Sequence, residues 1–171
     1  MRVEMRIFDE KFRNNKVRYL LQCSLATLFI LILLLFMGAS SNITVIVALG
    51  ASSFIAFTMP EAQVSRPRFL IGGYLVGIAA GCLGHHLSVM PLLTQLPIIQ
   101  EFPNVVFAAL SVGIAIFVMV ITNTEHPPAA SLALGLVLHD CNTMTIMVLL
   151  LGIMSLSGIK AVLRPVLRNL L

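Results

Sequence analysis

Long apolar stretches separated by short polar connections dominate the chain. Each long stretch can cross the roughly 30 Å hydrocarbon core of a bilayer as a helix of about 20 residues. Two further stretches are shorter or less regular, and none of the six contains an acidic or basic residue in its middle. The pattern predicts an all-α polytopic transmembrane bundle of about six spans, which occupy approximately residues 19–38, 43–59, 69–90, 104–122, 127–139 and 143–163.

Two of these stretches differ from ordinary spans. The second contains the small residues Gly50-Ala51-Ser52-Ser53 and ends at Pro60, and the fifth begins at a pair of prolines and is short. We therefore expect the second and fifth helices to be broken. The segments GASSFIAF (50–57) and PAASLALG (128–135) are faintly similar, which is compatible with two inverted three-helix halves, an arrangement common in transporters.

Composition supports a membrane protein and excludes most soluble classes. The chain has 171 residues, of which 58% are hydrophobic and 11% charged. A soluble domain carries about 25% charged residues to cover its surface. A chain this apolar needs lipid as part of its solvent. With six spans in 171 residues, little of the chain remains for a soluble enzyme module. We expect one membrane domain, residues 19–163, between a basic segment (1–18) and a short basic tail (164–171).

The net charge of +4 does not indicate a nucleic-acid partner, because the basic residues occupy three clusters outside the apolar stretches. Such clusters orient membrane proteins, with the basic connections on the cytoplasmic side. Six crossings of an inner membrane place both termini in the cytoplasm and leave all three outer connections without Lys or Arg. The alternative has five crossings and a re-entrant 127–139 segment, and it places the last cluster outside. The clusters are Arg2–Arg18, Arg66 with Arg68, and Lys160 with Arg164 and Arg168.

The N-terminal segment allows two interpretations. Apolar residues one helical turn apart among charges fit an interfacial amphipathic helix, and a solvated basic tail fits equally well. The following apolar run is too long for the core of a signal peptide, so we expect the first helix to be retained. The cysteines at 23, 82 and 141 are scattered, and their spacing predicts no disulfide framework.

The most distinctive local feature is Thr122-Asn123-Thr124-Glu125-His126-Pro127-Pro128-Ala129-Ala130-Ser131. Proline is tolerated in the first turn of a helix, so a helix is predicted to begin near residues 125–127. Its N–H groups and positive dipole end suit a small anion. Glu125 and His126 are candidates for gating or for holding this connection in place. A helix start without any ligand is an equally valid interpretation.

Other polar residues are weaker candidates. Arg66 and Arg68 could attract an anion, or they could act only as topology signals. Histidines and an aspartate at the expected outer helix ends have ligand types that suit zinc or copper, but their spacing matches no established site. The glycines of the third stretch favour close helix packing. The weak metal candidates are His85, His86, His139 and Asp140.

Two blocks of sequence resemble the HPP family of integral membrane proteins, which is named for its His-Pro-Pro triplet. The first is Glu125-His126-Pro127-Pro128-Ala129-Ala130. The second is Gly50-Ala51-Ser52-Ser53 followed by Pro60, Ala62-Gln63, Arg66-Pro67-Arg68 and Gly72-Gly73. The resemblance covers roughly residues 20–160. The chain departs from the family pattern at Phe69, where relatives have Asn, and at Tyr74, where they have His.

The resemblance implies transport of a small monovalent anion, with nitrite the best-known substrate of the family. Carried onto this chain, it implies that an ion contacts Gly50, Ser52, Ser53, Arg66, Arg68, His126, Pro127, Pro128 and Ser131. An approach of Ser53 to His126 would support this site. No cofactor is implied, and no nucleophile–base arrangement or nucleotide-binding motif favours an enzyme. The partners expected are membrane lipids and the anion, and the few short spans are compatible with a homodimer. The alternative functions are a non-transporting membrane sensor or scaffold and, less favoured, a metal-ion transporter.

Overall fold

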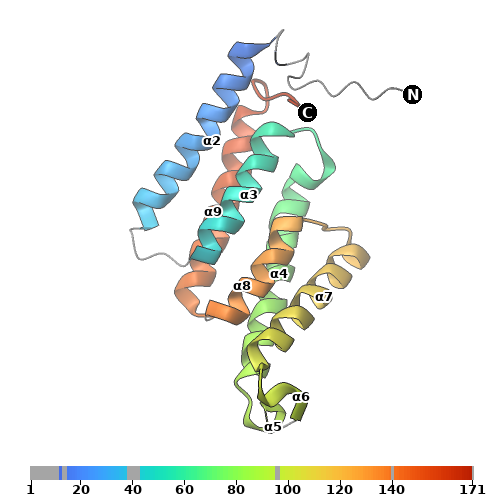
Figure 1. Ribbon diagram of the computed structural model, residues 1–171. Helices are drawn as coiled ribbons and strands as arrows, with labels where there is room; N and C mark the ends of the chain where they lie inside the picture. Colours follow the sequence, from blue (N-terminus) through green and yellow to red (C-terminus); the bar gives the residue numbers. More distant parts are fainter. Residues whose placement is uncertain (1–11, 13–14, 38–42, 95–96, 140, 171) are drawn as a thin grey trace, which may run out of the picture.

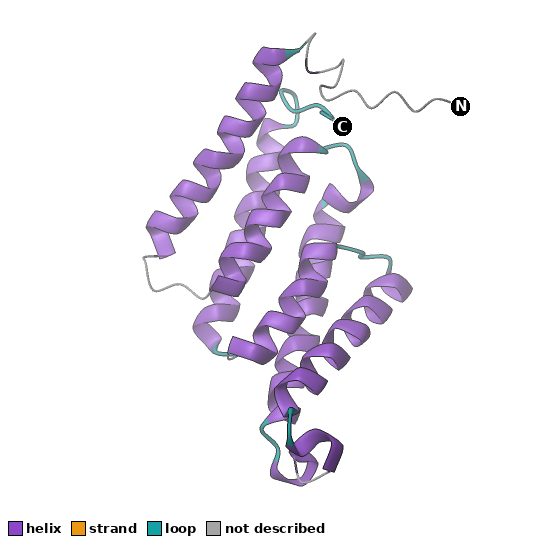
Figure 2. Cartoon of the chain, in the orientation of Figure 1, coloured by secondary structure: helices purple, strands orange, loops and turns teal. Residues whose placement is uncertain are grey.

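The computed structural model describes residues 12, 15–37, 43–94, 97–139 and 141–170, and these residues form a helical bundle without strands (Figures 1 and 2). Six helices make up the bundle, and one turn of 3-10 helix and two single-turn helices lie in its connections. The elements are α2 (Lys16–Met37), α3 (Ile43–Thr58), η1 (Gln63–Ser65), α4 (Pro67–Ser88), α5 (Pro91–Thr94), α6 (Pro97–Gln100), α7 (Pro103–Thr122), α8 (Pro127–His139) and α9 (Thr143–Leu163).

Proline determines where several helices begin. Pro67, Pro103 and Pro127 are the first residues of α4, α7 and α8, and a proline there sacrifices only an N–H that has no partner within the helix. The start of α9 is instead capped by Asn142, whose side chain accepts a hydrogen bond from the Thr145 N–H at 2.8 Å. The predicted helix start at residues 125–127 is confirmed.

The predicted breaks in the second and fifth helices are wrong, and α8 runs without interruption from Pro127 to His139. Helix α3 runs without interruption through Gly50-Ala51-Ser52-Ser53. Alanine is the best helix former and a single glycine costs only about 1 kcal/mol. The helix interior contains no proline that would remove a backbone hydrogen bond. What distinguishes α3 and α8 is their length, because their 16 and 13 residues span only about 24 and 20 Å.

The six helices alternate in direction, as expected for six crossings. Four of them, α2, α4, α7 and α9, are long and apolar enough to cross a membrane, and α3 and α8 are the shorter apolar helices. Figure 1 shows the start of α2 and the end of α9 at the same end of the bundle. Lys160 binds the backbone of the α3–α4 connection there. The last basic cluster therefore lies with Arg66, which contradicts the re-entrant alternative.

The two halves pack as inverted repeats. Helix α3 packs against α2, α8 and α9, and helix α8 packs against α7, α3 and α4. The remaining packed pairs are α2 with α9, α7 with α4, and α4 with α9. Exchanging α2 with α7, α3 with α8 and α4 with α9 returns the same set of pairs. Because each half has three spans, the exchange also reverses the direction of every helix.

Helices α4 and α8 approach each other at backbone distance. A methyl group on Gly77 would lie 2.3 Å from the carbonyl oxygen of Ala129, and one on Gly81 would lie 2.9 Å from that of Ala133. Any side chain at these positions would push the helices apart. The predicted glycine packing face is therefore confirmed, and it packs on α8.

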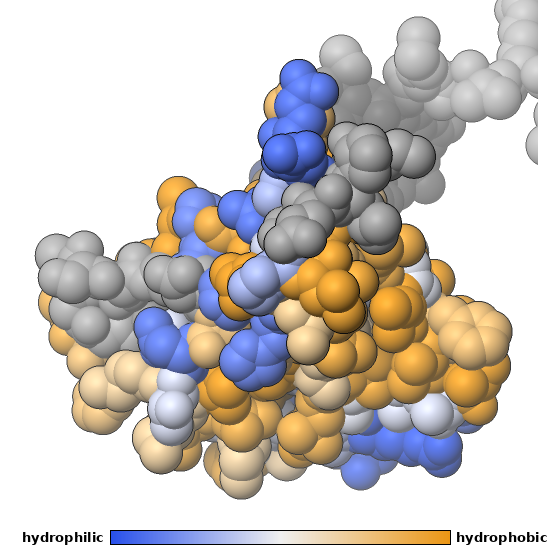
Figure 3. All heavy atoms as spheres, turned by 90° about the horizontal axis from the view of Figure 1, so that it is seen from below, coloured by the Kyte–Doolittle hydropathy of each residue, from blue (hydrophilic) through white to orange (hydrophobic). Residues whose placement is uncertain are grey.

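The outside of the bundle is apolar. Large hydrophobic side chains on α2 and α7 remain exposed, including Phe36 at 86% and Phe117 at 65%. Figure 3 shows hydrophobic residues over most of the visible periphery, with hydrophilic residues in small groups. Such a surface is stable only in contact with lipid or with another apolar surface.

The C-terminal segment packs back onto the bundle. Leu167 and Leu170 are buried, and the Leu170 N–H donates to the carbonyl of Thr58 at 2.8 Å. Gln22 on α2 is fully buried; its amide donates to the carbonyls of Phe57 and Arg168, and its carbonyl oxygen accepts from the Arg168 N–H. These bonds tie α2 to the bundle at that end. Most of the predicted N-terminal segment 1–18 lies outside the described residues.

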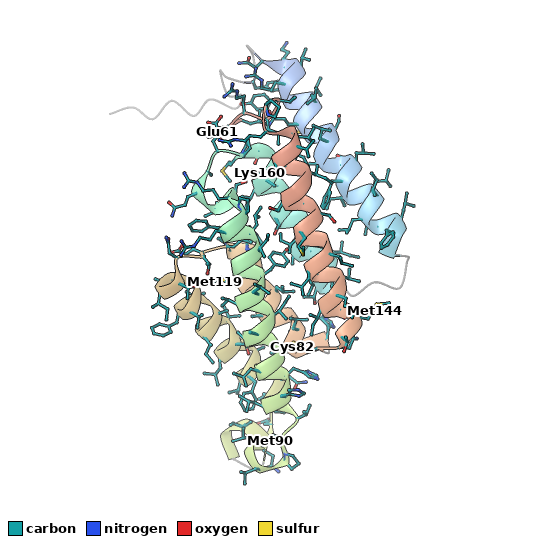
Figure 4. The ribbon with its side chains drawn as sticks, turned by 180° about the vertical axis from the view of Figure 1, so that it is seen from behind. Glu61, Cys82, Met90, Met119, Met144 and Lys160 are labelled. Carbon is teal, nitrogen blue, oxygen red and sulfur yellow. A yellow bond between two sulfur atoms is a disulfide. The ribbon has the colours of Figure 1, made fainter. Side chains whose placement is uncertain are left out.

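Cys82 and Cys141 form a disulfide, which the sequence interpretation missed. Their Cα atoms are 5.3 Å apart although 59 positions separate them in the chain. Cys82 lies in an apolar stretch, where a cysteine usually behaves as a small hydrophobic residue. The bond joins α4 to the α8–α9 connection. In Figure 4, Cys82 lies well away from Lys160, toward the other end of α4.

The close approach of α4 and α8 makes a prediction about stability. We expect Gly77→Ala to lower the free energy of unfolding by roughly 1–3 kcal/mol, because the added methyl overlaps the Ala129 carbonyl. Gly113→Ala on α7 is the matched control. Nothing lies within 4 Å of its added methyl, so better helix propensity should leave stability equal or up to about 1 kcal/mol higher. Thermal unfolding in detergent measures both, and equal effects of the two substitutions would contradict the packing described.

Candidate functional site

A buried chain of polar side chains connects three parts of the fold. Ser52 on α3 lies with its hydroxyl oxygen 2.8 Å from the Tyr74 hydroxyl on α4 and 2.9 Å from Nε2 of His126, just before α8. Nδ1 of His126 lies 3.2 Å from the carbonyl of Val64. Ser52, Tyr74 and His126 are at most 1% exposed. We call these three side chains the buried polar network.

The geometry assigns every proton in the buried polar network. The Val64 carbonyl can only accept, so Nδ1 of His126 carries a proton and donates. A neutral imidazole then accepts at Nε2, which makes the Ser52 hydroxyl the donor to His126. The Ser52 oxygen is free to accept from Tyr74. One neutral tautomer of His126 therefore satisfies the whole chain of hydrogen bonds.

Burial favours this neutral form. His126 lies in the connection between α7 and α8, outside the spanning helices, and its burial lowers the pKa from 6.5 to about 4, against a smaller raising effect of the hydrogen bond to Val64. Protonation would place a second donor at Nε2 and leave the Ser52 hydroxyl proton without this acceptor. The network therefore holds α3, α4 and α8 together at neutral pH and is weakened by acid.

The start of α8 is poorer in N–H donors than the sequence interpretation assumed. Pro127 and Pro128 have no N–H group, and the Ala129 N–H donates to the carbonyl of His126. Few N–H groups of α8 are therefore left for an anion at this helix start, although the helix dipole still favours negative charge there. The expected anion site stays a prediction.

A basic cavity lies beside the α3–α4 connection. Its volume is about 550 Å³, and it opens between the start of α4, the end of α9 and the C-terminal segment. Among the described residues, only Arg168 of its basic residues has an acidic partner, Glu61, at 3.4 Å between Nη1 and Oε1. Its lining consists of Pro60, Glu61, Arg66, Pro67, Ser157, Lys160, Ala161, Arg164, Leu167 and Arg168. Figure 4 shows Glu61 and Lys160 at the same end of the bundle.

Three consecutive residues connect the basic cavity to the buried polar network. Val64 accepts the hydrogen bond of His126, Ser65 accepts that of the Lys160 ammonium group, and Arg66 lines the cavity. The segment from Val64 to Arg66 thus contacts the buried polar network at one residue and the basic cavity at the next two. A change in either region acts directly on the same short segment.

The structure brings together only part of the predicted ion site. Ser52, rather than Ser53, approaches His126, because Ser53 donates to the carbonyl of Leu49 one turn earlier. Arg66 lines the basic cavity, whereas Arg68 donates to the carbonyl of Thr122 at 3.0 Å.

The other predicted residues lie near the network or away from it. Pro127 and Ser131 are exposed, Pro128 is buried in the bundle, and Glu125 is half-buried. Gly50 is half-buried, with open space where a side chain would be. Of the predicted residues, Ser52 and His126 therefore lie in the buried polar network and Arg66 lines the basic cavity, and the ion site stays a prediction.

The weak metal candidates are not gathered into one site. Nδ1 of His85 lies 3.4 Å from the carbonyl of Val137, and His86 and His139 are exposed. Asp140 lies outside the described residues. Across the part of the chain that the structure describes, no group of three or more His, Cys, Asp or Glu side chains is arranged to hold a metal ion.

Sequence reasoning missed four polar residues that matter here. Tyr74 was noted only as a departure from the HPP pattern, yet it completes the buried polar network. Lys160 was assigned to topology, although it is buried. Ser65 and Gln22 gave no pattern at all, except that Gln22 is a polar residue within an otherwise apolar stretch.

The fold and the site define a polytopic helical membrane protein with polar groups enclosed between two inverted halves. A family model described as "HPP, transmembrane region" matches residues 12–170. The chain belongs to this family, as its His-Pro-Pro block indicated. Comparison with curated proteins finds no match, and no solved structure matches either.

Neighbouring serines provide a test of the buried polar network. Ser52→Ala leaves Tyr74 and Nε2 of His126 without their shared partner, so we expect a loss of roughly 1–3 kcal/mol in stability. Ser53→Ala removes only a bond to the backbone one turn earlier, so its effect should be below about 1 kcal/mol. Thermal unfolding in detergent measures both variants. A larger loss for Ser53→Ala would contradict the network.

The lowered pKa of His126 predicts an acid-sensitive fold. Because the folded pKa lies near 4 and the unfolded pKa near 6.5, the unfolded state binds more protons between these values. The contribution of His126 is therefore complete above about pH 6.5 and is lost as the pH falls toward 4, by roughly 3 kcal/mol in total. The free energy of unfolding, measured from pH 8 to 4, should fall less steeply in His126→Gln than in the wild type. Parallel pH profiles would contradict the assignment.

Proposed function

We propose that this protein transports a small monovalent anion, most favourably nitrite, across the membrane. The basic cavity is the observation that carries the proposal. It gathers Arg66, Lys160, Arg164 and Arg168 around a space of about 550 Å³, against the single acid Glu61. A cavity with this excess of positive charge raises the local concentration of anions, and its low-dielectric walls strengthen the effect.

The arrangement of the bundle supports transport over a purely structural role. Inverted three-helix halves are a common architecture of transporters, whose sites lie where the halves meet. In this chain α3 and α8 meet at the Ser52–His126 contact, and Val64 to Arg66 connect that contact to the basic cavity. The resemblance to nitrite-transporting members of the HPP family supplies the choice of nitrite. Such a transporter needs no catalytic residues and no cofactor.

We also propose the orientation in the membrane. The described basic residues lie at one end of the bundle, which the rule for basic connections places in the cytoplasm. The Cys82–Cys141 disulfide involves the α8–α9 connection at the other end, and disulfides persist in oxidising compartments outside the cytoplasm. Both arguments favour the proposed orientation, with the two termini in the cytoplasm and the protein in the cytoplasmic, or inner, membrane.

Nitrite uptake into proteoliposomes tests the function. We expect uptake above that of empty vesicles, and Arg66→Gln should reduce the apparent affinity by roughly tenfold because one cation of the cavity is lost. The matched control is Lys16→Gln, which removes a positive charge from a residue at the start of α2 that does not line this cavity. No uptake by protein that is shown to be folded would refute the proposal.

A further inference from the structure

Lys160 occupies an unusual position in the basic cavity. It lies in the last turn of α9 and lines the cavity, yet its side chain is only 8% exposed. Its ammonium group donates one hydrogen bond, to the carbonyl of Ser65. An ammonium group has three donors, so two remain available to a ligand in the cavity that Lys160 lines.

The hydroxyl of Ser65 has no hydrogen-bond partner among the described residues. Ser65 is fully buried, and its Oγ is the one buried side-chain oxygen or nitrogen that lacks a hydrogen bond among the described residues. Buried hydroxyls are nearly always hydrogen-bonded, and an exception points to a missing partner. Ser65 adjoins the lining of the basic cavity, because its carbonyl accepts from Lys160 and the next residue, Arg66, lines the cavity.

The surrounding charge specifies the kind of partner. Arg66 and Arg164 line the cavity together with Lys160, and none of the three has an acidic partner among the described residues. Like charges gathered in a partly enclosed space repel one another, and an anion relieves the repulsion. Ammonium and hydroxyl groups both donate, so an ion with several acceptor oxygens satisfies both at once.

We propose that Ser65 Oγ and Lys160 Nζ bind a small oxyanion at the inner end of the basic cavity, with Arg66 and Arg164 supplying the attracting charge. The proposal deepens the proposed function, since it names the residues and the ligand class of its cavity. A bound oxyanion accepts from the donors of the Lys160 ammonium group that the Ser65 carbonyl leaves free.

Ser65→Ala separates a ligand-binding hydroxyl from a mere packing defect. The substitution removes a buried hydroxyl without a partner, so the protein without ligand should unfold at an equal or higher temperature. If the hydroxyl also binds the anion, the variant loses the response to ligand at the same time. If the hydroxyl is only a packing defect, Ser65→Ala should keep or raise the unfolding temperature and leave the response to ligand unchanged.

The experiment follows thermal unfolding in detergent while sodium nitrite replaces sodium gluconate at constant ionic strength. We expect nitrite to raise the unfolding temperature of the wild type in a saturable way. The apparent dissociation constant should rise roughly tenfold in Ser65→Ala, and the response should disappear in Lys160→Gln. Lys16→Gln, with the same chemical change at the start of α2, should respond as the wild type does. Sodium chloride should give a weaker response than nitrite.

Three outcomes overturn this proposal: the wild type shows no saturable response to nitrite, Ser65→Ala binds nitrite as tightly as the wild type, or chloride is as effective as nitrite. The first two remove the site and the third removes the oxyanion class. Saturable binding that depends on Ser65 and Lys160, without uptake in vesicles, would refute transport and leave the site intact. Uptake that is unaffected in Ser65→Ala and Lys160→Gln would refute the proposed site and leave transport intact.

Discussion

The close approach of α4 to α8 is the constraint on which the polar interior depends. Glycines on α4 let its backbone meet that of α8, with Gly73 facing the Cβ of His126 and Gly77 facing the Ala129 carbonyl. This contact fixes His126 against the α3–α4 connection. Only then can its two ring nitrogens reach Val64 and Ser52 together. A bulkier α4 would separate these groups by more than a hydrogen bond tolerates.

The two polar regions have opposite electrostatic requirements. The buried polar network needs a neutral histidine, whereas the basic cavity gathers cations without enough acids to balance them. They stay distinct because each binds a different residue of one short segment: His126 binds Val64, and Lys160 binds Ser65. An anion in the cavity lowers the positive potential near His126 without contacting it. The segment from Val64 to Arg66 is therefore where charge in the cavity can influence the packing of α3, α4 and α8.

The sequence predicted the architecture better than the chemistry. Periodic hydrophobicity and the placement of basic residues lead to six alternating helices, and the prolines lead to the start of α8, because these features depend on neighbouring residues in the chain. The choice of Ser52 over Ser53 depends on which side of α3 faces α8, and one position rotates a side chain by about 100°. Tyr74, Ser65 and Lys160 become functional candidates only through neighbours distant in sequence. The disulfide, likewise, joins residues that no local spacing pairs.

The inverted halves share their packing but differ in chemistry at their two ends. Near one end of the α3–α8 contact lie Ser52 and His126, and at the other a methyl group on Gly135 would lie 2.1 Å from the side chain of Thr44. That second end is tightly packed, and the disulfide also holds the α8–α9 connection to α4 there. The basic cavity opens at the basic end of the bundle, so in the proposed orientation it faces the cytoplasm. To open outward, α4 and the α8–α9 connection must move as one body, since they are covalently joined. In the proposed transport, we expect opening toward that end to separate α3 from α8 at the tight contact of Thr44 with Gly135.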